Sequence, residues 1–301
     1  MQGKETIRVI YIMGMGRSGS TLLNIILGNH PEIESFGDLI DLTRFGWLNN
    51  ELCSCGKNGN DCPFWSRVQH EWVKYASITI EEYLALQNTF EHIRSIPRLC
   101  KEKVRKSTKF MLYEDHTLLL FKAIRAVSNK PFIADASKTP GRAFALSLMP
   151  EIDLRLIHLV RDARGVAFSK KKPTIPPATP VLVSAVIWVL VNIFSTWVCR
   201  QLGAEKARRI RYEDFTDTPE KILNEIGPLS GVDLTDIAAA VSVGESMHIG
   251  HIIAGNRIRM DGGVLPRSAD REWTGKPSIN ERCLIKIIAG GLMRYYGFNE
   301  K

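Results

Sequence analysis

A turn rich in glycine and serine separates two apolar segments near the start of the chain, and it is suited to binding a phosphate group. Residues Val9–Leu27 read VIYIMGMGRSGSTLLNIIL, a hydrophobic strand, the turn and the beginning of an apolar helix. Amides at a helix N-terminus attract anions, and glycines let an anion approach them closely. The neighbouring residues add a positive charge, hydroxyl donors and a flexible backbone, and they are Arg17, Ser18, Gly19, Ser20 and Thr21.

The same turn lacks one residue that nucleoside triphosphate enzymes use. The spacing from Gly14 to Thr21 fits the pattern G-x-x-x-x-G-K-[ST], except that Ser20 occupies the lysine position. That lysine contacts the β- and γ-phosphates of a bound triphosphate, and Arg17 can supply charge only from mid-loop. We therefore expect a phosphate-like ligand without phosphoryl transfer from ATP or GTP. A strand–turn–helix corner without a ligand is the alternative.

Further segments read as strands that alternate with helices. Leu154–Val160 is almost continuously apolar, as in a buried parallel strand, and a helix is expected to begin near Asp162. Phe132–Ala134 and Ala207–Tyr212 are two more candidate strands. This alternation predicts a P-loop-like α/β fold, with three α/β/α layers around a central parallel sheet. We expect residues 1–301 to form one domain, with a helical insertion over residues 39–130.

Three cations follow predicted strands directly. These are Arg17, Lys138 and Arg161. Ligands of open α/β sheets bind outside the carboxyl ends of the strands, and cations gathered there repel one another unless an anion lies between them. The three residues together therefore predict an anion site, although each one alone could be an ordinary surface cation.

Composition and charge narrow the class of protein. The chain has 301 residues with 45% hydrophobic and 24% charged residues, as folded proteins do, and a net charge of +8. The charge suggests an anionic ligand, and nucleic acid is not expected because no basic helix with interleaved aromatics occurs. The first residues do not read as a signal peptide, so a cytoplasmic location is expected.

Three of the six cysteines are close together in the sequence, at Cys53, Cys55 and Cys62. Six cysteines in a chain of this length do not make a disulfide scaffold. The favoured interpretation is reduced structural thiols, and no metal site is predicted. A disulfide, or a metal site with His70 or a distant residue as fourth ligand, stays open.

The segment Val181–Cys199 is apolar enough to span a bilayer by length. Polar residues interrupt it, and it lies between two α/β units. It therefore predicts a buried helix that crosses the core, with peripheral membrane contact as the alternative. The interrupting residues are Ser184, Asn192, Ser195 and Thr196.

Several motifs in order resemble the sulfotransferases that use 3′-phosphoadenosine 5′-phosphosulfate (PAPS). They are GRSGSTLL at Gly16–Leu23, SKTPGRA at Ser137–Ala143, RDARGVAFS at Arg161–Ser169 and RYEDF at Arg211–Phe215. The loop is more similar to the bacterial and Golgi-type branch, which includes carbohydrate and tyrosylprotein enzymes, than to the cytosolic small-molecule branch. The resemblance covers most of the chain.

The resemblance implies a role for each matching residue. Arg17, Ser18, Gly19, Ser20 and Thr21 would bind the 5′-phosphosulfate. Arg161 and Ser169 would bind the 3′-phosphate, and Lys138 would stabilise the charge that develops as the sulfuryl group leaves. Asn256 and Arg259 would belong to a late loop that closes over the nucleotide.

The acceptor, a hydroxyl or amine, needs a base within hydrogen-bond reach. The stretch NHPEIESFGD resembles the segment that places this base, so Asp38 is the first candidate, with Glu34 and His116 as rivals. Carbohydrate is the preferred acceptor, while lipid-linked glycan, peptide tyrosine and small alcohol stay open. The helical insertion is expected to shape the acceptor pocket, although its aromatic residues are expected mainly in the core. These are Trp47, Phe64, Trp65, Trp72 and Tyr75.

Two other functions are compatible with the phosphate loop. One is a P-loop kinase or nucleotidase with a degenerate loop, in which Asp135 would hold a metal ion. The other is a nucleotide-binding or membrane-associated scaffold without catalysis. The missing loop lysine argues against the first, and both rank below sulfuryl transfer.

Overall fold

A five-stranded parallel sheet forms the centre of the molecule. The computed structural model describes residues 6–171, 179–255, 257–261, 263, 274 and 277–298. The strand order is β2-β3-β1-β4-β5, so that β1 lies in the middle. The strands are β1 (Ile7–Met13), β2 (Ile33–Ser35), β3 (Phe132–Lys138), β4 (Ile152–Val160) and β5 (Ala207–Arg211).

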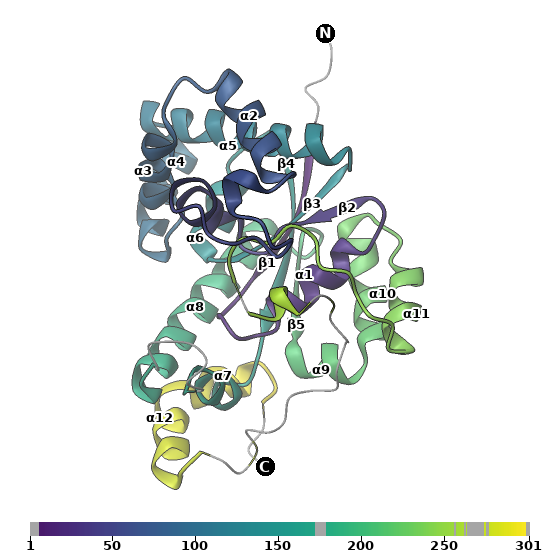
Figure 1. The fold of residues 1–301 in the computed structure, drawn as a ribbon. Coiled ribbons are helices and arrows are strands. Elements are labelled where there is room, and N and C mark those ends of the chain that lie inside the picture. Colours follow the sequence, from purple (N-terminus) through teal and green to yellow (C-terminus); the bar gives the residue numbers. More distant parts are fainter. Residues whose placement is uncertain are drawn as a thin grey trace.

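Alternating side chains of the central strand enter two separate cores. Val9, Tyr11 and Met13 pack with the helical insertion and with α6 (Pro140–Ser147), while Ile10 and Ile12 pack with the helices on the other face. Figure 1 shows the helices on the two sides of the sheet. The predicted three-layer α/β/α fold is confirmed. The second face is covered by α1 (Ser20–Gly28), α10 (Pro219–Ser230) and α11 (Thr235–Ser242).

The predicted strands are confirmed with small shifts in their ends, but β2 was not predicted. It is an edge strand of three residues, paired only with β3 among the described residues. Its single buried apolar residue, Ile33, gives too short a pattern to recognise. The helix expected near Asp162 is α7 (Ala163–Lys171), and the Asp162 carboxylate accepts a bond of 2.8 Å from the Arg164 amide.

Residues between β2 and β3 form a helical insertion. Three of its tryptophans, Trp47, Trp65 and Trp72, are buried in the core as expected, whereas Tyr75 is exposed. The helix η2 is a π-helix. The elements of the insertion are η1 (Leu39–Asp41), η2 (Leu42–Leu48), η3 (Gly59–Asp61), α2 (Trp65–Tyr75), α3 (Ile80–Phe90), η4 (Ile93–Ser95), α4 (Ile96–Val104) and α5 (Thr108–Ser128).

The apolar helix α8 (Val181–Leu202) differs from the prediction of a wholly buried helix. Its polar residues Ser184, Asn192 and Ser195 are buried, whereas apolar residues such as Leu190 and Ile193 are 47% and 48% exposed. The prediction is wrong because the polar side of α8 faces the protein interior, where Asn192 Oδ1 lies 2.9 Å from His158 Nε2, and the apolar side is left exposed. By length and composition alone, α8 is one described helix that could cross a membrane.

In Figure 1, α12 (Ile279–Tyr295) lies beside α7 in the lower part of the view, and α9 (Tyr212–Asp217) lies near β5. Helix α8 packs against α7 and α12 around Trp188 and Met293. The remaining described helix is η5 (Arg257–Met260).

Candidate active site

The turn between β1 and α1 is held close to its neighbours on both sides. Gly14 donates its amide to the Lys138 carbonyl at 3.0 Å. A Cβ on Gly14 would lie 2.2 Å from the carbonyl oxygen of Leu159, and one on Gly19 would lie 2.4 Å from the Tyr212 ring. Gly19 also has a φ of 89°. Only glycine fits these two positions, so the close packing fixes the path of the loop.

The first turn of α1 carries groups that can receive an anion. Gly19 is the N-cap and offers no side chain to the free amides of the helix. Ser18, Ser20 and Thr21 are all buried beside these amides. Within the described part of the chain, the Ser18 hydroxyl has no hydrogen-bond partner. Since buried hydroxyls are normally bonded, this one is free to bind a ligand.

The loop is joined to α7 and to the segment before it by Ser169 and Arg161, which the resemblance assigns to a second phosphate. The Arg17 guanidinium donates from Nε to the Ser169 hydroxyl at 3.0 Å. Arg161 donates from Nη1 to the Arg17 carbonyl at 2.9 Å, and its guanidinium lies 4.5 Å from the centre of the Tyr212 ring. The structure therefore brings Arg17, Arg161 and Ser169 together beside the glycine turn.

Positive charge is crowded at this place. Burial lowers the pKa of Lys170, and the nearby Arg17 guanidinium lowers it further. A buried cation that another cation opposes is stabilised when an anion binds. The electrostatics of the cluster agree with the anion site that the sequence predicts.

Lys138 forms an ion pair with Asp38 on the other side of the loop. Lys138 has a φ of 67°, a backbone conformation that residues other than glycine rarely adopt. Burial raises the pKa of Asp38, while the Lys138 ammonium opposes that rise. The pair therefore places a cation and a partly desolvated carboxylate together at the end of β3.

The backbone beside Asp38 is fixed by a buried asparagine of α1. The Gly37 amide donates to the Asn24 side-chain oxygen at 2.8 Å. Asn24 in turn donates to the Ala134 carbonyl at 3.1 Å, and the Ala136 amide donates to the Gly37 carbonyl at 2.7 Å. These bonds hold the Asp38 segment against both α1 and β3.

A cavity of about 460 Å³ opens between the glycine turn, Lys138 and the helical insertion. His92 and Arg94 line it from the insertion, and sequence reasoning identified neither residue. Burial and neighbouring arginines lower the pKa of His92, so its imidazole is neutral near pH 7. The other lining residues are Gly14, Met15, Gly16, Ile93, Ser137, Lys138, Thr139, Pro140 and Val191.

Asp41 is a second acidic residue near this pair that the sequence did not identify. Burial and the Asp38 charge raise the pKa of Asp41 to about 6. Its amide donates to the Asp38 carbonyl at 3.0 Å, so the two acids share one tight turn. The turn therefore brings two carboxyl groups near a single lysine.

The two rival bases have other partners. Glu34 forms an ion pair of 3.2 Å with Lys130. The His116 ring donates from Nδ1 to the Leu112 carbonyl at 2.8 Å and accepts at Nε2 from the Ser77 amide at 3.1 Å. His116 is buried on α5 among the insertion helices, so it is a structural residue.

The order of these motifs and the geometry around the loop agree with a match to a known family. A family model described as the sulfotransferase family matches residues 9–236, more than half of the chain. The chain belongs to this family. No curated protein sequence matches the sulfotransferase chain described here.

Solved structures of sulfotransferases share its fold. The sulfotransferase domain of the Synechococcus PCC 7002 olefin synthase is 17% identical, with a TM-score of 0.51, and the match covers 100% of this chain and 98% of that one. The sulfotransferase domain of the curacin biosynthetic pathway is 17% identical, with a TM-score of 0.51, and the match covers 96% of this chain and 98% of that one. Sulfotransferase STF9 from Mycobacterium avium is 12% identical, with a TM-score of 0.50, and the match covers 98% of this chain and 78% of that one. At such identities these likenesses concern the fold alone.

The acid that a kinase would need for metal binding is used elsewhere in this sulfotransferase. Asp135 is wholly buried and accepts a bond of 2.9 Å from Arg142 Nε. It also accepts bonds from the Ser137 amide and hydroxyl. Arg142 reaches Glu91 as well, so these residues form a structural network beneath the cavity.

The late segment (residues 250–255 and 257–261) lies over Asp38, but Arg259, which the family resemblance assigns to the nucleotide, does not reach the glycine turn. A Cβ on Gly255 would lie 3.5 Å from Asp38 Oδ2 and 3.9 Å from Thr21 Oγ1. Asn256 lies outside the described residues. Arg259 donates to the Leu52 carbonyl at 3.0 Å rather than pointing at the glycine turn.

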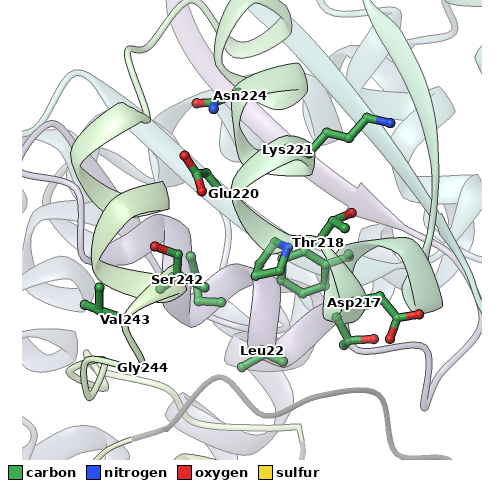
Figure 2. Close-up of a pocket in the computed structure, with 14 residues that line it drawn as sticks. Leu22, Asp217, Thr218, Glu220, Lys221, Asn224, Ser242, Val243 and Gly244 are labelled. Carbon is green, nitrogen blue, oxygen red and sulfur yellow. The ribbon is translucent and has the colours of Figure 1, made fainter.

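A larger cavity, about 740 Å³ in volume, lies on the far side of the first turn of α1. Figure 2 shows Leu22 on one side of it and Ser242, Val243 and Gly244 on another. Leu22 directly follows Thr21 of the phosphate loop. Helix α9 links this cavity to the Arg161 cluster, because Phe215 lines the cavity and Tyr212 packs under Arg161.

Proposed function

We propose that this sulfotransferase moves the sulfuryl group of PAPS to a hydroxyl or amine of an acceptor, and that the acceptor is a carbohydrate. The observation that carries the proposal is the contact of Arg17 with both Arg161 and Ser169 beside a phosphate loop without lysine. A donor with separate 5′- and 3′-phosphate groups suits this arrangement, because each phosphate has its own cations and hydroxyls.

The residues at the loop fit the 5′-phosphosulfate. The free helix amides and the unpartnered Ser18 hydroxyl can donate to its oxygens. The cation cluster fits the 3′-phosphate, because an anion there would relieve the opposition between Arg17 and Lys170. The cavity beside Leu22 has space and apolar surface for the adenine of the nucleotide, whose ribose carries both phosphates.

Lys138 and Asp38 can perform the transfer step between them. PAPS supplies an activated sulfuryl group, whose bond to the phosphate oxygen breaks as the acceptor oxygen or nitrogen bonds to sulfur. Lys138 stabilises the negative charge that develops on that phosphate oxygen. Asp38 takes the acceptor proton, and desolvation makes its carboxylate a stronger base than an exposed one.

The smaller cavity supports a polar acceptor. His92, Arg94, Ser137 and Thr139 line it and offer donors and acceptors to a sugar. The resemblance of the loop to the carbohydrate and tyrosylprotein branch also favours a hydroxyl acceptor. A carbohydrate would place one hydroxyl near Lys138 while its other hydroxyls bind the lining side chains.

Calorimetry with 3′-phosphoadenosine 5′-phosphate (PAP) tests the donor site. Wild type is compared with Arg161→Ala, using PAP, adenosine 5′-phosphate and ATP with Mg²⁺ as ligands. We expect PAP to bind more tightly than adenosine 5′-phosphate, and Arg161→Ala to reduce that advantage about 10- to 100-fold, the value of charged hydrogen bonds. Arg155→Ala is the control, because Arg155 lies on β4, the strand that Arg161 follows, but pairs with Asp153.

Each outcome decides between the candidate functions. Loss of the PAP preference in Arg161→Ala alone supports the donor site and justifies a screen of carbohydrate acceptors. A preference for ATP with Mg²⁺ would replace the proposal with a kinase or nucleotidase. PAP binding without transfer to any acceptor would favour a scaffold without catalysis.

A further inference from the structure

Three cysteines and one histidine from distant parts of the chain meet beside the late segment. They are Cys53, Cys55, Cys62 and His251, and their sulfur and nitrogen atoms all lie within 4.8 Å of one another. Cys62 Sγ is 3.7 Å from both Cys53 Sγ and Cys55 Sγ. His251 Nδ1 is 3.2 Å from Cys62 Sγ and 4.0 Å from Cys53 Sγ.

Four of the six separations between these atoms lie near those of a tetrahedral zinc site. Zinc binds thiolate sulfur at about 2.3 Å and imidazole nitrogen at about 2.0–2.1 Å. At tetrahedral angles the ligands are then separated by about 3.8 Å for two sulfurs and about 3.6 Å for sulfur and nitrogen. The two sulfur contacts of 3.7 Å match the first value. The contacts of 3.2 and 4.0 Å lie on either side of the second value.

The backbone around the cysteines turns back on itself so that their side chains converge. The Cys53 amide donates to the Lys57 carbonyl at 2.8 Å, and the Gly56 amide donates to the Cys53 carbonyl at 2.9 Å. Gly56 has a φ of 81°, which favours glycine in this tight turn. Leu52 and Asn58 pair across its base. Backbone hydrogen bonds alone thus hold Cys53 and Cys55 in position.

His251 is oriented by independent contacts of its ring and backbone. Its ring stacks on Phe64, with centroids 5.4 Å apart, and its carbonyl accepts a bond of 3.0 Å from Trp65 Nε1. Ser54 binds the segment on both sides of it, through the Gly250 carbonyl and the Ile252 amide. These contacts direct the Nδ1 edge of the ring toward the three sulfurs.

We propose that Cys53, Cys55, Cys62 and His251 bind one zinc ion. Four protein ligands complete the tetrahedron, so the site is structural and leaves no position for substrate. Cys53 and Cys62 are buried whereas Cys55 is exposed, which gives the metal a route of entry. This inference replaces the favoured interpretation of reduced thiols without metal, and it takes a distant residue, His251, rather than His70 as the fourth ligand.

The zinc ion would connect two segments that border the active site. His251 is followed four residues later by Gly255, which packs over Asp38 and Thr21. Arg259 already reaches from η5 to the Leu52 carbonyl beside the cysteine turn. A zinc ion at this position would hold the late segment against the insertion, and so keep the wall over Asp38 in place.

Metal analysis of the purified full-length chain tests the proposal directly. Elemental mass spectrometry, after dialysis against metal-free buffer, is expected to find about one zinc per chain. Replacement by Co²⁺ is expected to give the visible spectrum of tetrahedral cobalt with sulfur-to-metal charge transfer. Both readouts are independent of sulfuryl transfer, so the zinc proposal and the proposed function can fail separately.

Variants identify the ligands. His251→Ala is expected to lose zinc or its retention during dialysis, His251→Cys to keep it, and the control His70→Ala to keep it. Denatured wild type is also titrated for free thiols. A metal-free protein with six free thiols, one with four free thiols and a disulfide, or one that holds iron instead would each overturn the proposal. Because these three results come from wild type, a variant that fails to fold does not prevent the decision.

Discussion

Lys138 at the end of β3 and Asp38 after β2 form an ion pair across 100 positions of sequence. The pair depends on an unusual backbone, since Lys138 has a φ of 67°. Burial raises the pKa of Asp38, and the lysine is the largest influence that lowers it. The lysine therefore influences the protonation of the carboxylate, so a change at Lys138 affects both the leaving group and the base.

Lys138→Met is expected to slow sulfuryl transfer about 100- to 1000-fold, the cost of removing one group that stabilises developing charge. PAP affinity should change little, because PAP lacks the sulfuryl group whose departure creates that charge. Single-turnover transfer from radiolabelled PAPS and calorimetry with PAP separate the two effects. Lys130→Met is the control, as Lys130 pairs with Glu34. An equal loss of binding and rate would show that Lys138 holds the nucleotide instead.

Substitution by alanine is expected to weaken PAP binding at one glycine of the phosphate loop and to leave it unchanged at another. In Gly19→Ala the new Cβ would lie 2.4 Å from Tyr212, whereas at Gly16 nothing lies within 4 Å of a Cβ. Because Tyr212 supports the Arg161 guanidinium, Gly19→Ala should weaken PAP binding at least 10-fold and Gly16→Ala should not. Calorimetry with PAP measures both. Similar affinities in the two variants would contradict the role given to Tyr212.

The sheet and the edge at which three cations gather could be predicted from the sequence for a physical reason. Buried parallel strands give continuous apolar runs, and ligands bind at their carboxyl ends, so Arg17, Lys138 and Arg161 could be placed at one edge. His92 and Arg94 could not be placed in this way. They reach the cavity because the insertion helices pack back toward the sheet, a contact set by tertiary packing.

The wrong prediction for α8 and the absence of His251 from the predicted cysteine cluster have related causes. Polar residues in an apolar run look like interruptions in the sequence, but Asn192 is wholly buried and faces His158. Burial of the polar side leaves the apolar side of α8 outside. His251 lies 189 positions from Cys62, and no local pattern connects two residues so far apart.

The buried polar face of α8 gives a prediction about stability. Asn192 bonds to the His158 ring at 2.9 Å, and burial lowers the pKa of His158 to about 4. Asn192→Ala should leave this neutral ring without its partner and reduce the free energy of unfolding by about 1–3 kcal/mol. Denaturant unfolding measures this difference.

Ile193→Ala, one position along the helix, is the matched control. Ile193 is 48% exposed, so its truncation should cost less than that of the polar neighbour, about 0.5 kcal/mol. A larger loss in Ile193→Ala than in Asn192→Ala would mean that another surface covers the apolar side of α8 in solution.

Asp41 gives a prediction about the effect of pH on stability. Its pKa is raised to about 6, first by burial and then by the Asp38 charge. An acid whose pKa is higher in the folded state binds more protons there, so its ionisation lowers stability as the pH rises from about 4 to 6. Asp41→Asn has no such charge. The variant should therefore match wild type at pH 4 and exceed it by about 1–3 kcal/mol at pH 7.

Denaturant unfolding of both proteins at intervals from pH 4 to pH 8 measures this difference. The control is Asp61→Asn, since Asp61 is exposed in the same insertion, and it should change stability by less than about 0.5 kcal/mol at each pH. A constant gap between Asp41→Asn and wild type would mean that the amide changes packing rather than charge. A gap that closes toward pH 8 would reverse the sign, and would mean that the Lys138 ammonium stabilises the Asp41 carboxylate more than burial opposes it.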